Sequence, residues 1–545
     1  MEAIPELTAR IAKAAFPKGN PYLTLRDHLG ILFQDESFSH LFSRRGQPAE
    51  APWRRTLVTI MSFVQDLSDV QAADAVRSRL DWKYALSLDL EDPGFDASVL
   101  CEFRARLLQG DAEKLLLDTL LAWCREKKLL KAGGNQHTDS THVLAAVRTL
   151  NRSELVLETM RAALDALALA KPTWLLGQLQ PEWEGRYIRW AQIQRLPQKP
   201  EERQHLALTV GQDGVRLLQA IYAADAPQTL RQLSQVQILR RIWVQNYQQV
   251  DSQVQWRETG NLPPAAYFLS SPHDVDAHLA RKGDLGWIGY KVHLTETCEE
   301  QMPPLITHVE TTAAPTADTD ALPAVYQALQ NKDLLPKTHL VDTGYVDAAL
   351  LVSSQQEFGV DLLGPPRPNL KWQAQEKQGF DLSHFTIDWD NKQATCPEGQ
   401  VSRYWDTLRD NRGTQVLKIK FASKTCRVCP KRSECIRSQA KAPRRTLTVR
   451  LQEQHEALQQ ARKRMLTKEY AREYARRAGI EGTLSRGVRT CGMRCSRYVG
   501  LAKVHLGNVL TALAINVLRL GEWLSEAPQR KPRQSPFSKL IAANA

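Results

Sequence analysis

Residues 137–143 read HTDSTHV, and this short stretch decides how the rest of the chain is interpreted. Its β-branched residues, together with the apolar run that follows, predict a β-strand of about ten residues. A single carboxylate, Asp139, lies within this strand among small neighbours that leave room beside it: Thr138, Ser140 and Thr141. A lone acid of this kind more often serves a turn or a helix cap than a metal. The role of Asp139 therefore depends on the partners that the rest of the chain supplies.

Two strands and a helix follow later in the chain. WIGYKVHLTET (287–297) and PLITHVETTAA (304–314) alternate apolar and polar residues, which predicts a β-hairpin. The segment ADTDALPAVYQALQNKD (317–333) predicts a helix with Thr316 or Asp318 as its cap. These elements extend the strand of Asp139 into a larger α/β unit.

Two more acids complete a recognisable order. THLVDTGY (338–345) predicts a short strand that ends at a second acid, Asp342, and runs into a glycine-containing turn. A long basic helix is predicted from residue 452 to residue 480, with its end near Gly482. Glu481, at the end of this helix, is the candidate third acid. The order is then strand acid, hairpin, helix, strand acid and helix acid.

This order resembles the RNase H-like fold of DDE transposases, in which two Asp residues project from neighbouring strands and a Glu on a later helix completes the site. Bacterial insertion-sequence transposases of this type carry the motif Tyr-x2-Arg-x3-Glu-x6-Lys. Tyr474, Arg477 and Glu481 match its first three positions. Residues at i, i+3 and i+7 of a helix share one face, so these side chains can address one site. The resemblance implies that Asp139, Asp342 and Glu481 are catalytic.

The fourth position of the motif departs from the family pattern, because Val488 stands where the Lys is expected. Arg486 and Arg489 are the nearest cations. Arg489 can replace the Lys if the backbone bends at Gly487. The family implies that these cations contact DNA.

The resemblance covers most of the chain. Asp-Thr-Gly-Tyr (342–345) matches the family's Asp-x-Gly-Tyr/Phe pattern, and three longer stretches match one subgroup in the right order: 92–104, 286–297 and 478–506. The implied fold class is α/β, with an RNase H-like mixed sheet flanked by helices, an all-α N-terminal domain, a helical insertion and a cysteine-containing, β-rich insertion. The expected domains are a helical N-terminal domain for DNA-end binding or dimerisation (1–130), the catalytic core (131–150 and 251–365), the helical insertion (151–250), the β-rich insertion (366–450), the C-terminal helices of the core (451–525) and a loose tail (526–545).

Three carboxylates suit a particular chemistry. Transposition breaks and joins phosphodiesters, and two divalent ions held by carboxylates serve such displacements at phosphorus. Carboxylates favour Mg²⁺ or Mn²⁺ over metals that prefer imidazole, so His137 and His142 are not the expected ligands. The family implies that Tyr474 and Arg477 contact DNA near the cleaved bond, by stacking and by phosphate binding. The alternatives are that Tyr474 only packs and that Arg477 only pairs with Glu473.

Four of the nine cysteines form a separate cluster: Cys396, Cys426, Cys429 and Cys435. Two thiolates at the Cys-x2-Cys spacing can bind one zinc ion, and the other two could complete four ligands. Such a closed site would be structural and would help the β-rich insertion to fold. The alternative is four reduced structural cysteines.

Charge and composition point to a nucleic-acid partner. The net charge is +12, and the segment from Gln460 to Lys503 holds twelve Lys and Arg against three acids. The first residues, MEAIPELTAR, lack the basic region and apolar core of a signal peptide, so none is expected. The longest apolar run, residues 509–518, is shorter than the roughly 20 residues of a membrane span. The expectation is a cytoplasmic bacterial protein, nucleoid-associated when DNA-bound and homodimeric in a synaptic complex with double-stranded DNA, namely the element's terminal inverted repeats and target DNA.

Two other functions remain open at this point. One is a transposase-derived DNA-binding protein that has lost catalysis, which the missing motif Lys favours. The other is a metal-dependent nuclease of the same fold, which would hydrolyse DNA without joining ends.

Overall fold

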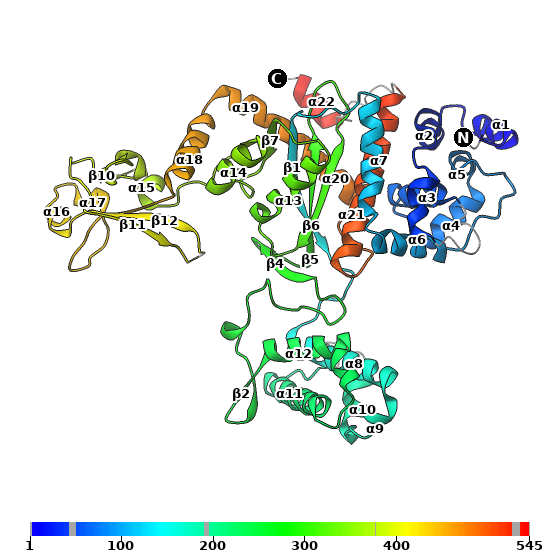
Figure 1. Ribbon diagram of the computed structural model, residues 1–545, viewed down its shortest axis with the longest axis horizontal. Helices are drawn as coiled ribbons and strands as arrows, with labels where there is room; N and C mark the ends of the chain where they lie inside the picture. The colour runs from blue at the N-terminus through cyan, green and yellow to red at the C-terminus, as the bar shows by residue number, and fades with distance from the viewer. Residues whose placement is uncertain are drawn as a thin grey trace.

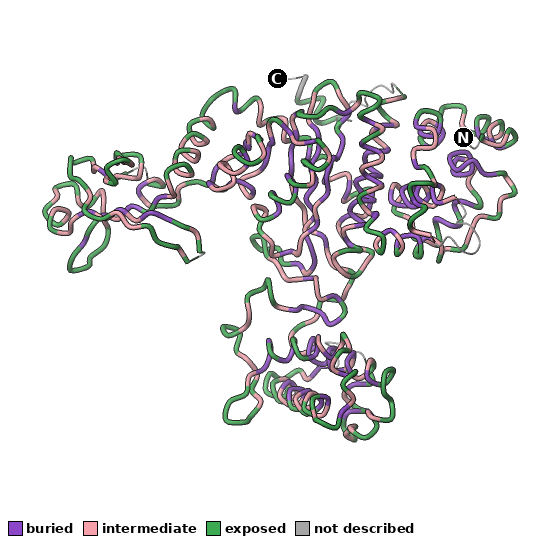
Figure 2. The backbone as a smooth tube through the Cα atoms, viewed as in Figure 1, coloured by how far each residue is buried: buried purple, intermediate pink, exposed green. Residues whose placement is uncertain are grey.

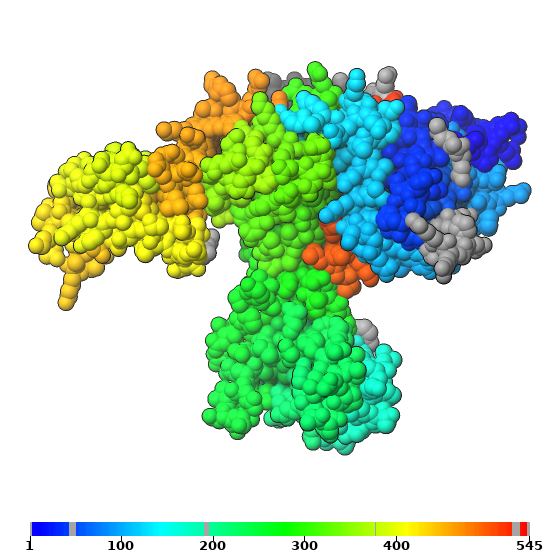
Figure 3. Space-filling view, in the orientation of Figure 1, coloured from blue at the N-terminus to red at the C-terminus, as the bar shows by residue number. Residues whose placement is uncertain are grey.

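The computed structural model describes residues 3–42, 51–189, 196–376, 378–411, 413–525 and 535–543. A mixed sheet stands at the centre, and three groups of elements extend from it (Figure 1). The space-filling view shows the same arrangement, with the N-terminal helices on one side, the β-rich insertion on the other and the helical insertion below (Figure 3).

The central sheet has the strand order β4-β5-β1-β7-β8, and β6 pairs with β5 as well. β1 is antiparallel to β5 and parallel to β7, which is in turn parallel to β8. The predicted hairpin is confirmed, because β5 and β6 pair antiparallel. The strands are β1 (Gln136–Leu144), β4 (His278–Lys282), β5 (Leu285–Thr297), β6 (Ile306–Ala313), β7 (Thr338–Val341) and β8 (Asp361–Leu363).

Helices cover this sheet, and the C-terminal ones differ from their predicted form. The expected single helix from 452 to 480 is interrupted near residue 466, where Thr467 caps a new helix through its side chain. The predicted end near Gly482 is also wrong, because the helix that carries Glu481 runs on to Thr490. These helices are α13 (Asp318–Asn331), α14 (Ala348–Phe358), α18 (Gln452–Arg464), α19 (Lys468–Tyr474), the 3-10 turn η6 (Ala475–Arg477), α20 (Ala478–Thr490) and α21 (Leu501–Leu524).

Helix α21 is the central helix of the core. Its 24 residues are long and apolar enough to cross a membrane by length and composition, which the shorter run 509–518 did not suggest. Most of that apolar stretch is buried, however, against β6 on one side and α3 and α7 on the other. Its burial is that of a core helix (Figure 2).

The N-terminal region is helical, as predicted, and shares its core with the sheet. One hydrophobic cluster runs from residues such as Phe38 and Leu120 to Val292 on β5 and Leu513 on α21. The elements are α1 (Glu6–Ala15), α2 (Pro21–Leu29), η1 (Asp35–Leu41), α3 (Pro52–Val64), α4 (Asp69–Ser78), α5 (Leu80–Ala85), α6 (Ser98–Gln109) and α7 (Glu113–Glu126).

The helical insertion has a hydrophobic core of its own, which includes Trp243, Tyr247 and Leu269. A two-stranded hairpin follows its last helix, so strand begins at Tyr247 where the sequence pattern predicted helix to 250. The core also runs past residue 250, the expected boundary. The elements are α8 (Arg152–Ala170), α9 (Pro172–Leu176), α10 (Pro181–Tyr187), α11 (Pro200–Tyr222), η3 (Gln228–Gln232), α12 (Ser234–Asn246), β2 (Tyr247–Val250), β3 (Gln253–Trp256) and η4 (Thr259–Asn261).

The β-rich insertion has a much smaller core, built around Phe385, Leu417 and Phe421. Its elements are α15 (Trp372–Gln375), η5 (Leu382–His384), β9 (Thr386–Asp388), β10 (Gln393–Thr395), β11 (Tyr404–Arg409), β12 (Gln415–Lys420), α16 (Ser423–Arg427), α17 (Arg432–Cys435) and β13 (Thr446–Val449). In the tail, expected to be loose, the structure has a helix, α22 (Pro536–Ala543), while 526–534 and 544–545 lie outside the described residues. The predicted α/β fold class is confirmed, with its helical N-terminal region and two insertions.

Candidate active site

The two strand acids lie on neighbouring strands. In the parallel pairing of β1 with β7, Thr138 stands opposite Val341, the last residue of β7, so the next residue along each segment is an aspartate: Asp139 within β1 and Asp342 directly after β7. Oδ1 of Asp139 accepts a hydrogen bond from the amide of Ser140 at 2.8 Å. Oδ1 of Asp342 accepts one from the amide of Gly344, also at 2.8 Å. Backbone amides thus fix one oxygen of each carboxylate and leave the other free for a further partner.

Arg477 connects the first strand acid to the helix acid. Its Nη2 donates to Oδ2 of Asp139 at 2.6 Å, and its Nη1 donates to Oε1 of Glu481 at 3.1 Å. The side chains of Asp139 and Arg477 are 14% and 13% exposed, whereas that of Glu481 is 65% exposed. The pairing of Arg477 with Glu473 that the sequence left open is not formed, because Glu473 pairs with Arg464.

The charges around Asp139 oppose one another. Burial raises the pKa of this carboxyl, and the nearby Asp342 raises it further, while the Arg477 guanidinium and the Ser140 amide lower it. The net shift of the pKa is upward. Two neighbouring carboxylates such as Asp139 and Asp342 repel each other when both are ionised, unless a cation lies nearby. Arg477 supplies part of the positive charge that offsets this repulsion.

Tyr474 lies beside the three acids. Its ring stacks on Tyr470 with centroids 5.4 Å apart and an interplanar angle of 11°. Burial raises the pKa of its hydroxyl, and Asp342, Asp139 and Glu481 all contribute to that rise. Tyr474 therefore both packs on a neighbour and borders the site.

The two candidate cations beyond Glu481 lie in different surroundings. Arg486 forms an ion pair with Glu522 on α21 at 3.0 Å. Arg489 is exposed at the end of α20, about 12 Å along the helix axis from Glu481. The bend considered at Gly487 is absent, because α20 stays helical there. A methyl group at Gly487 would come within 2.7 Å of Cε of Met493, so glycine serves close packing.

Two residues at the site, Asp318 and Lys291, were not singled out from the sequence as site residues. Asp318 does not cap α13. Instead, its Oδ1 pairs with Nζ of Lys291 at 3.0 Å and accepts a longer hydrogen bond from the Ser140 hydroxyl at 3.4 Å. A methyl group built at Gly344 would lie 2.8 Å from Oδ2 of Asp318 and 2.9 Å from Oδ1 of Asp342. The glycine thus keeps space open between these two carboxylates. In the sequence, the one hint of this ion pair was Lys291, a cation within a predicted strand.

The donor chemistry of this site suits Mg²⁺, which takes carboxylate oxygens as ligands. Among the described residues, no group of three or more acidic, histidine or cysteine side chains stands ready as a set of metal ligands. At the carboxylates, the guanidinium of Arg477 occupies one oxygen of Asp139 and one of Glu481.

The four clustered cysteines line one pocket, together with Arg432 and Arg445. All nine cysteines of the chain are free thiols. In the Cys396 turn, the amide of Gln400 donates to Sγ of Cys396 at 3.3 Å. Burial raises the pKa of Cys435 to about 11; the other three thiols add to this shift, while Arg445 opposes it. The structure thus brings the four cysteines together around one pocket.

The basic segment from 460 to 503 is only partly available to a ligand. Several of its arginines bind acidic groups of the protein itself: Arg464 with Asp361, Arg476 with Glu300, Arg486 with Glu522 and Arg497 with Asp66. Other cations remain exposed, among them Lys468, Arg472, Arg489 and Lys503. Part of the positive charge therefore stabilises the fold.

Two family models match the chain. Transposase DDE domain matches residues 395–521, which include Glu481 and the cysteine cluster, and Transposase domain (DUF772) matches residues 10–106, within the N-terminal helices. No curated protein and no solved structure matches the chain. The two matches occur in the order expected for a transposase, with the N-terminal helices first and the helix of the third acid last. Together the two matches support a DDE-type transposase of the insertion-sequence kind.

Proposed function

We propose that the chain cleaves DNA at the ends of its own insertion sequence and joins the freed 3′-hydroxyls to target DNA, with two Mg²⁺ or Mn²⁺ ions. Asp139, Asp342 and Glu481 are the proposed catalytic residues, on a core of the RNase H-like type. The observation that supports this most is the double contact of Arg477 with Asp139 and Glu481, beside Asp342 on the next strand.

The proposed metal ligands differ in how closely their present positions match those needed to bind metal. Asp139 and Asp342 already lie on adjacent strands, each with one oxygen fixed by a backbone amide. Glu481 is mostly exposed and joins them when Arg477 releases it. Two ions bound there would activate the attacking water or 3′-hydroxyl and stabilise the leaving oxygen.

Arg477 and Tyr474 are the proposed contacts to DNA next to the cleaved bond. The guanidinium of Arg477 already forks between two anionic oxygens, and the same geometry suits a phosphate. The ring of Tyr474 stacks on Tyr470 with one face, and we propose that a base of the DNA stacks on its other face. Arg486 and Arg489 are proposed to contact the DNA backbone further along α20.

The remaining proposals concern assembly. The N-terminal helices are proposed to recognise the element's terminal inverted repeats and to form a homodimer in the synaptic complex. The exposed cations near α20 would then face the bound double-stranded DNA.

A strand-transfer assay tests the function. Linear DNA carrying the element ends is incubated with the chain and Mg²⁺ or Mn²⁺, and cleaved and joined products are separated. Wild type should give joined product, and Asp139→Ala should give none. Equal yields from the two would overturn the proposal. DNA binding without any product would indicate the catalytically inactive DNA-binding protein, and cleavage without joining would indicate the nuclease.

We further propose a structural zinc ion held by Cys396, Cys426, Cys429 and Cys435. The support is the shared pocket, the N–H···S bond at Cys396 and the small core of this insertion, which suits a metal staple. The four sulfurs would draw together on binding. The purified chain should contain about one zinc per molecule, since one closed site takes four thiolates. Cys426→Ser with Cys429→Ser should lose it, whereas Cys491→Ser should not. A zinc-free wild type would contradict the proposal.

A further inference from the structure

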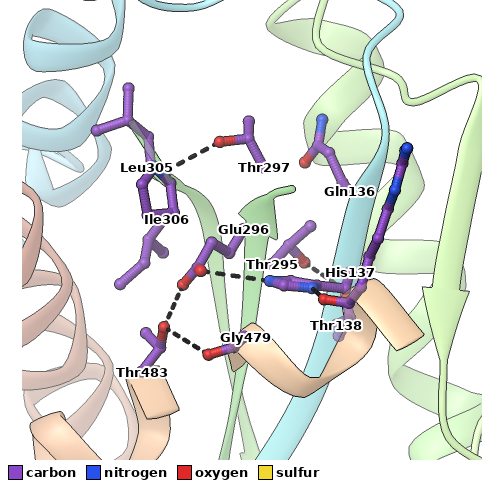
Figure 4. Close-up of polar contacts among 12 residues, drawn as sticks. Gln136, His137, Thr138, Thr295, Glu296, Thr297, Leu305, Ile306, Gly479 and Thr483 are labelled. Carbon is purple, nitrogen blue, oxygen red and sulfur yellow. Dashed lines mark hydrogen bonds and ion pairs between the residues drawn. The ribbon is translucent and has the colours of Figure 1, made fainter. Parts of the chain in front are cut away.

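A second cluster of charged residues lies between helix α20 and the sheet, near the carboxylates described above. Its centre is Glu296, whose side chain is only 1% exposed. Figure 4 shows this glutamate between His137 on β1 and Thr483 on α20. Burial of an ionised carboxylate is costly unless every oxygen has a partner, so its contacts are informative.

Both oxygens of Glu296 are engaged, and by three different elements. Oε1 lies 3.3 Å from Nε2 of His137. Oε2 accepts hydrogen bonds from the Thr483 hydroxyl at 2.6 Å and from Nη1 of Arg519 on α21 at 2.9 Å. Burial alone would raise the pKa of Glu296, but His137, Arg519 and Thr483 outweigh it, so the net shift is downward. The carboxylate is therefore held in its charged form.

The cluster reaches the segment that leads into α20. Nδ1 of His137 lies 3.2 Å from the backbone oxygen of Arg476, the residue before Arg477. Both partners of the imidazole, the Glu296 carboxylate and the Arg476 carbonyl, are hydrogen-bond acceptors. Gly479 faces the same ring, and a methyl group there would stand 3.2 Å from Cε1 of His137. The helix thus approaches β1 closely at this point.

Thr483 and Glu481 lie on different faces of the same helix. Residues two apart in an α-helix are about 200° apart around its axis, so one faces the core when the other faces outward. Apolar packing, as of Ile480, holds the helix against the sheet but is non-directional. Hydrogen bonds form only within a narrow range of distances and angles, so they limit how far the helix can slide or turn.

We propose that Glu296 is a positioning residue, which fixes α20 on β1 and β5 and so sets where Arg477 and Glu481 stand relative to Asp139. The inference rests on the proposed function for its catalytic readout. Its action is indirect: Glu296 binds His137, Thr483 and Arg519, and these hold the helix. Loss of such outer partners of metal-binding residues typically lowers metal affinity or activity by about 10- to 100-fold.

The test removes one hydroxyl and keeps the shape of the side chain. Thr483→Val deletes the donor to Glu296, and Thr483→Ser restores it. Thr490→Val is the matched control on the same helix, because among the described residues its hydroxyl bonds to the Arg486 backbone oxygen and to Cys491 and not to the Glu296 cluster. The two readouts in the full chain are hydrogen exchange of the α20 amides, and strand-transfer rate as a function of Mg²⁺ concentration.

The expected result is faster exchange in α20 and a strand-transfer rate about 10-fold lower in Thr483→Val, with a raised half-saturating Mg²⁺ concentration. Thr483→Ser and Thr490→Val should stay within about two-fold of wild type. If Thr483→Val matches Thr490→Val in both readouts while wild type is active, the inference is overturned. If wild type itself joins no DNA, the proposed function fails instead, and the exchange measurement still decides whether Glu296 and Thr483 hold the helix.

Discussion

Helix α20 contacts two arginine–carboxylate junctions that differ in burial, the outer one through Glu481 and the inner one through Thr483. At the outer junction, Arg477 links Asp139 to a Glu481 that is 65% exposed. At the inner junction, Arg519 binds Glu296, which is 1% exposed. An exposed pair is weak and can be exchanged for other partners, whereas breaking a buried pair leaves a charge without compensation. The inner junction is therefore suited to hold the helix, whereas at the outer junction the contact of Arg477 with the exposed Glu481 is the one most easily exchanged, since the Arg477–Asp139 pair is itself buried.

The largest expected effect is on activity, at the outer junction. Glu481→Gln keeps the size of the side chain and removes the charge that a metal ligand needs. We expect strand transfer to fall by at least about 10²- to 10³-fold, since charge stabilisation of several kcal/mol is lost from the transition state. Glu469→Gln, an exposed glutamate on α19, should behave as wild type. A rate for Glu481→Gln within ten-fold of wild type would remove this residue from the site.

The second effect is on stability, at the inner junction. Glu296→Ala leaves Arg519 and His137 buried without their carboxylate, and we expect the free energy of unfolding to fall by about 3–5 kcal/mol. Glu300→Ala, just past the end of β5, breaks an exposed pair with Arg476 and should cost less than about 1 kcal/mol. Denaturant unfolding of both variants measures the difference. Equal stabilities would mean that burial does not distinguish the two junctions.

The smallest effect concerns competition at the outer junction. Arg477→Ala frees oxygens of Asp139 and Glu481, so Mg²⁺ should bind these carboxylates more tightly. A ten-fold gain in affinity would raise the Mg²⁺-dependent increase in melting temperature by about 2 °C over that of wild type. Arg472→Ala removes an exposed cation from the neighbouring helix and serves as the control. An identical Mg²⁺ response in Arg477→Ala and wild type would show that the arginine does not occupy the cation's place.

Local patterns were enough to predict much of the fold. The strand of Asp139, the hairpin of β5 and β6, and the strand before Asp342 follow from alternation and β-branched residues. The interruption near residue 466 was missed because helical periodicity continues through it, and only the Thr467 cap marks the new helix. The strand at Tyr247 was missed because its residues follow a long helical pattern without a break.

The candidate site was only partly predictable. Asp139, Asp342 and Glu481 could be chosen by their order and motif. Asp318 was interpreted as a helix cap, because its partner Lys291 lies 27 residues earlier and is brought near only by the sheet. In the sequence, Glu296 is one polar residue in a strand of alternating apolar and polar residues. Its contacts with Thr483 and Arg519 span about two hundred residues of chain. Contacts of this kind arise from tertiary packing and leave no local pattern.

The most direct test of the account is strand transfer by wild type and by Asp342→Asn on linear DNA that carries the element ends. With Mg²⁺, wild type should convert these ends into joined product. Asp342→Asn, and wild type in the presence of a chelator, should bind the DNA but leave it uncut. Joined product at the wild-type level from Asp342→Asn, or without a divalent ion, would contradict the proposal that these carboxylates act through bound metal.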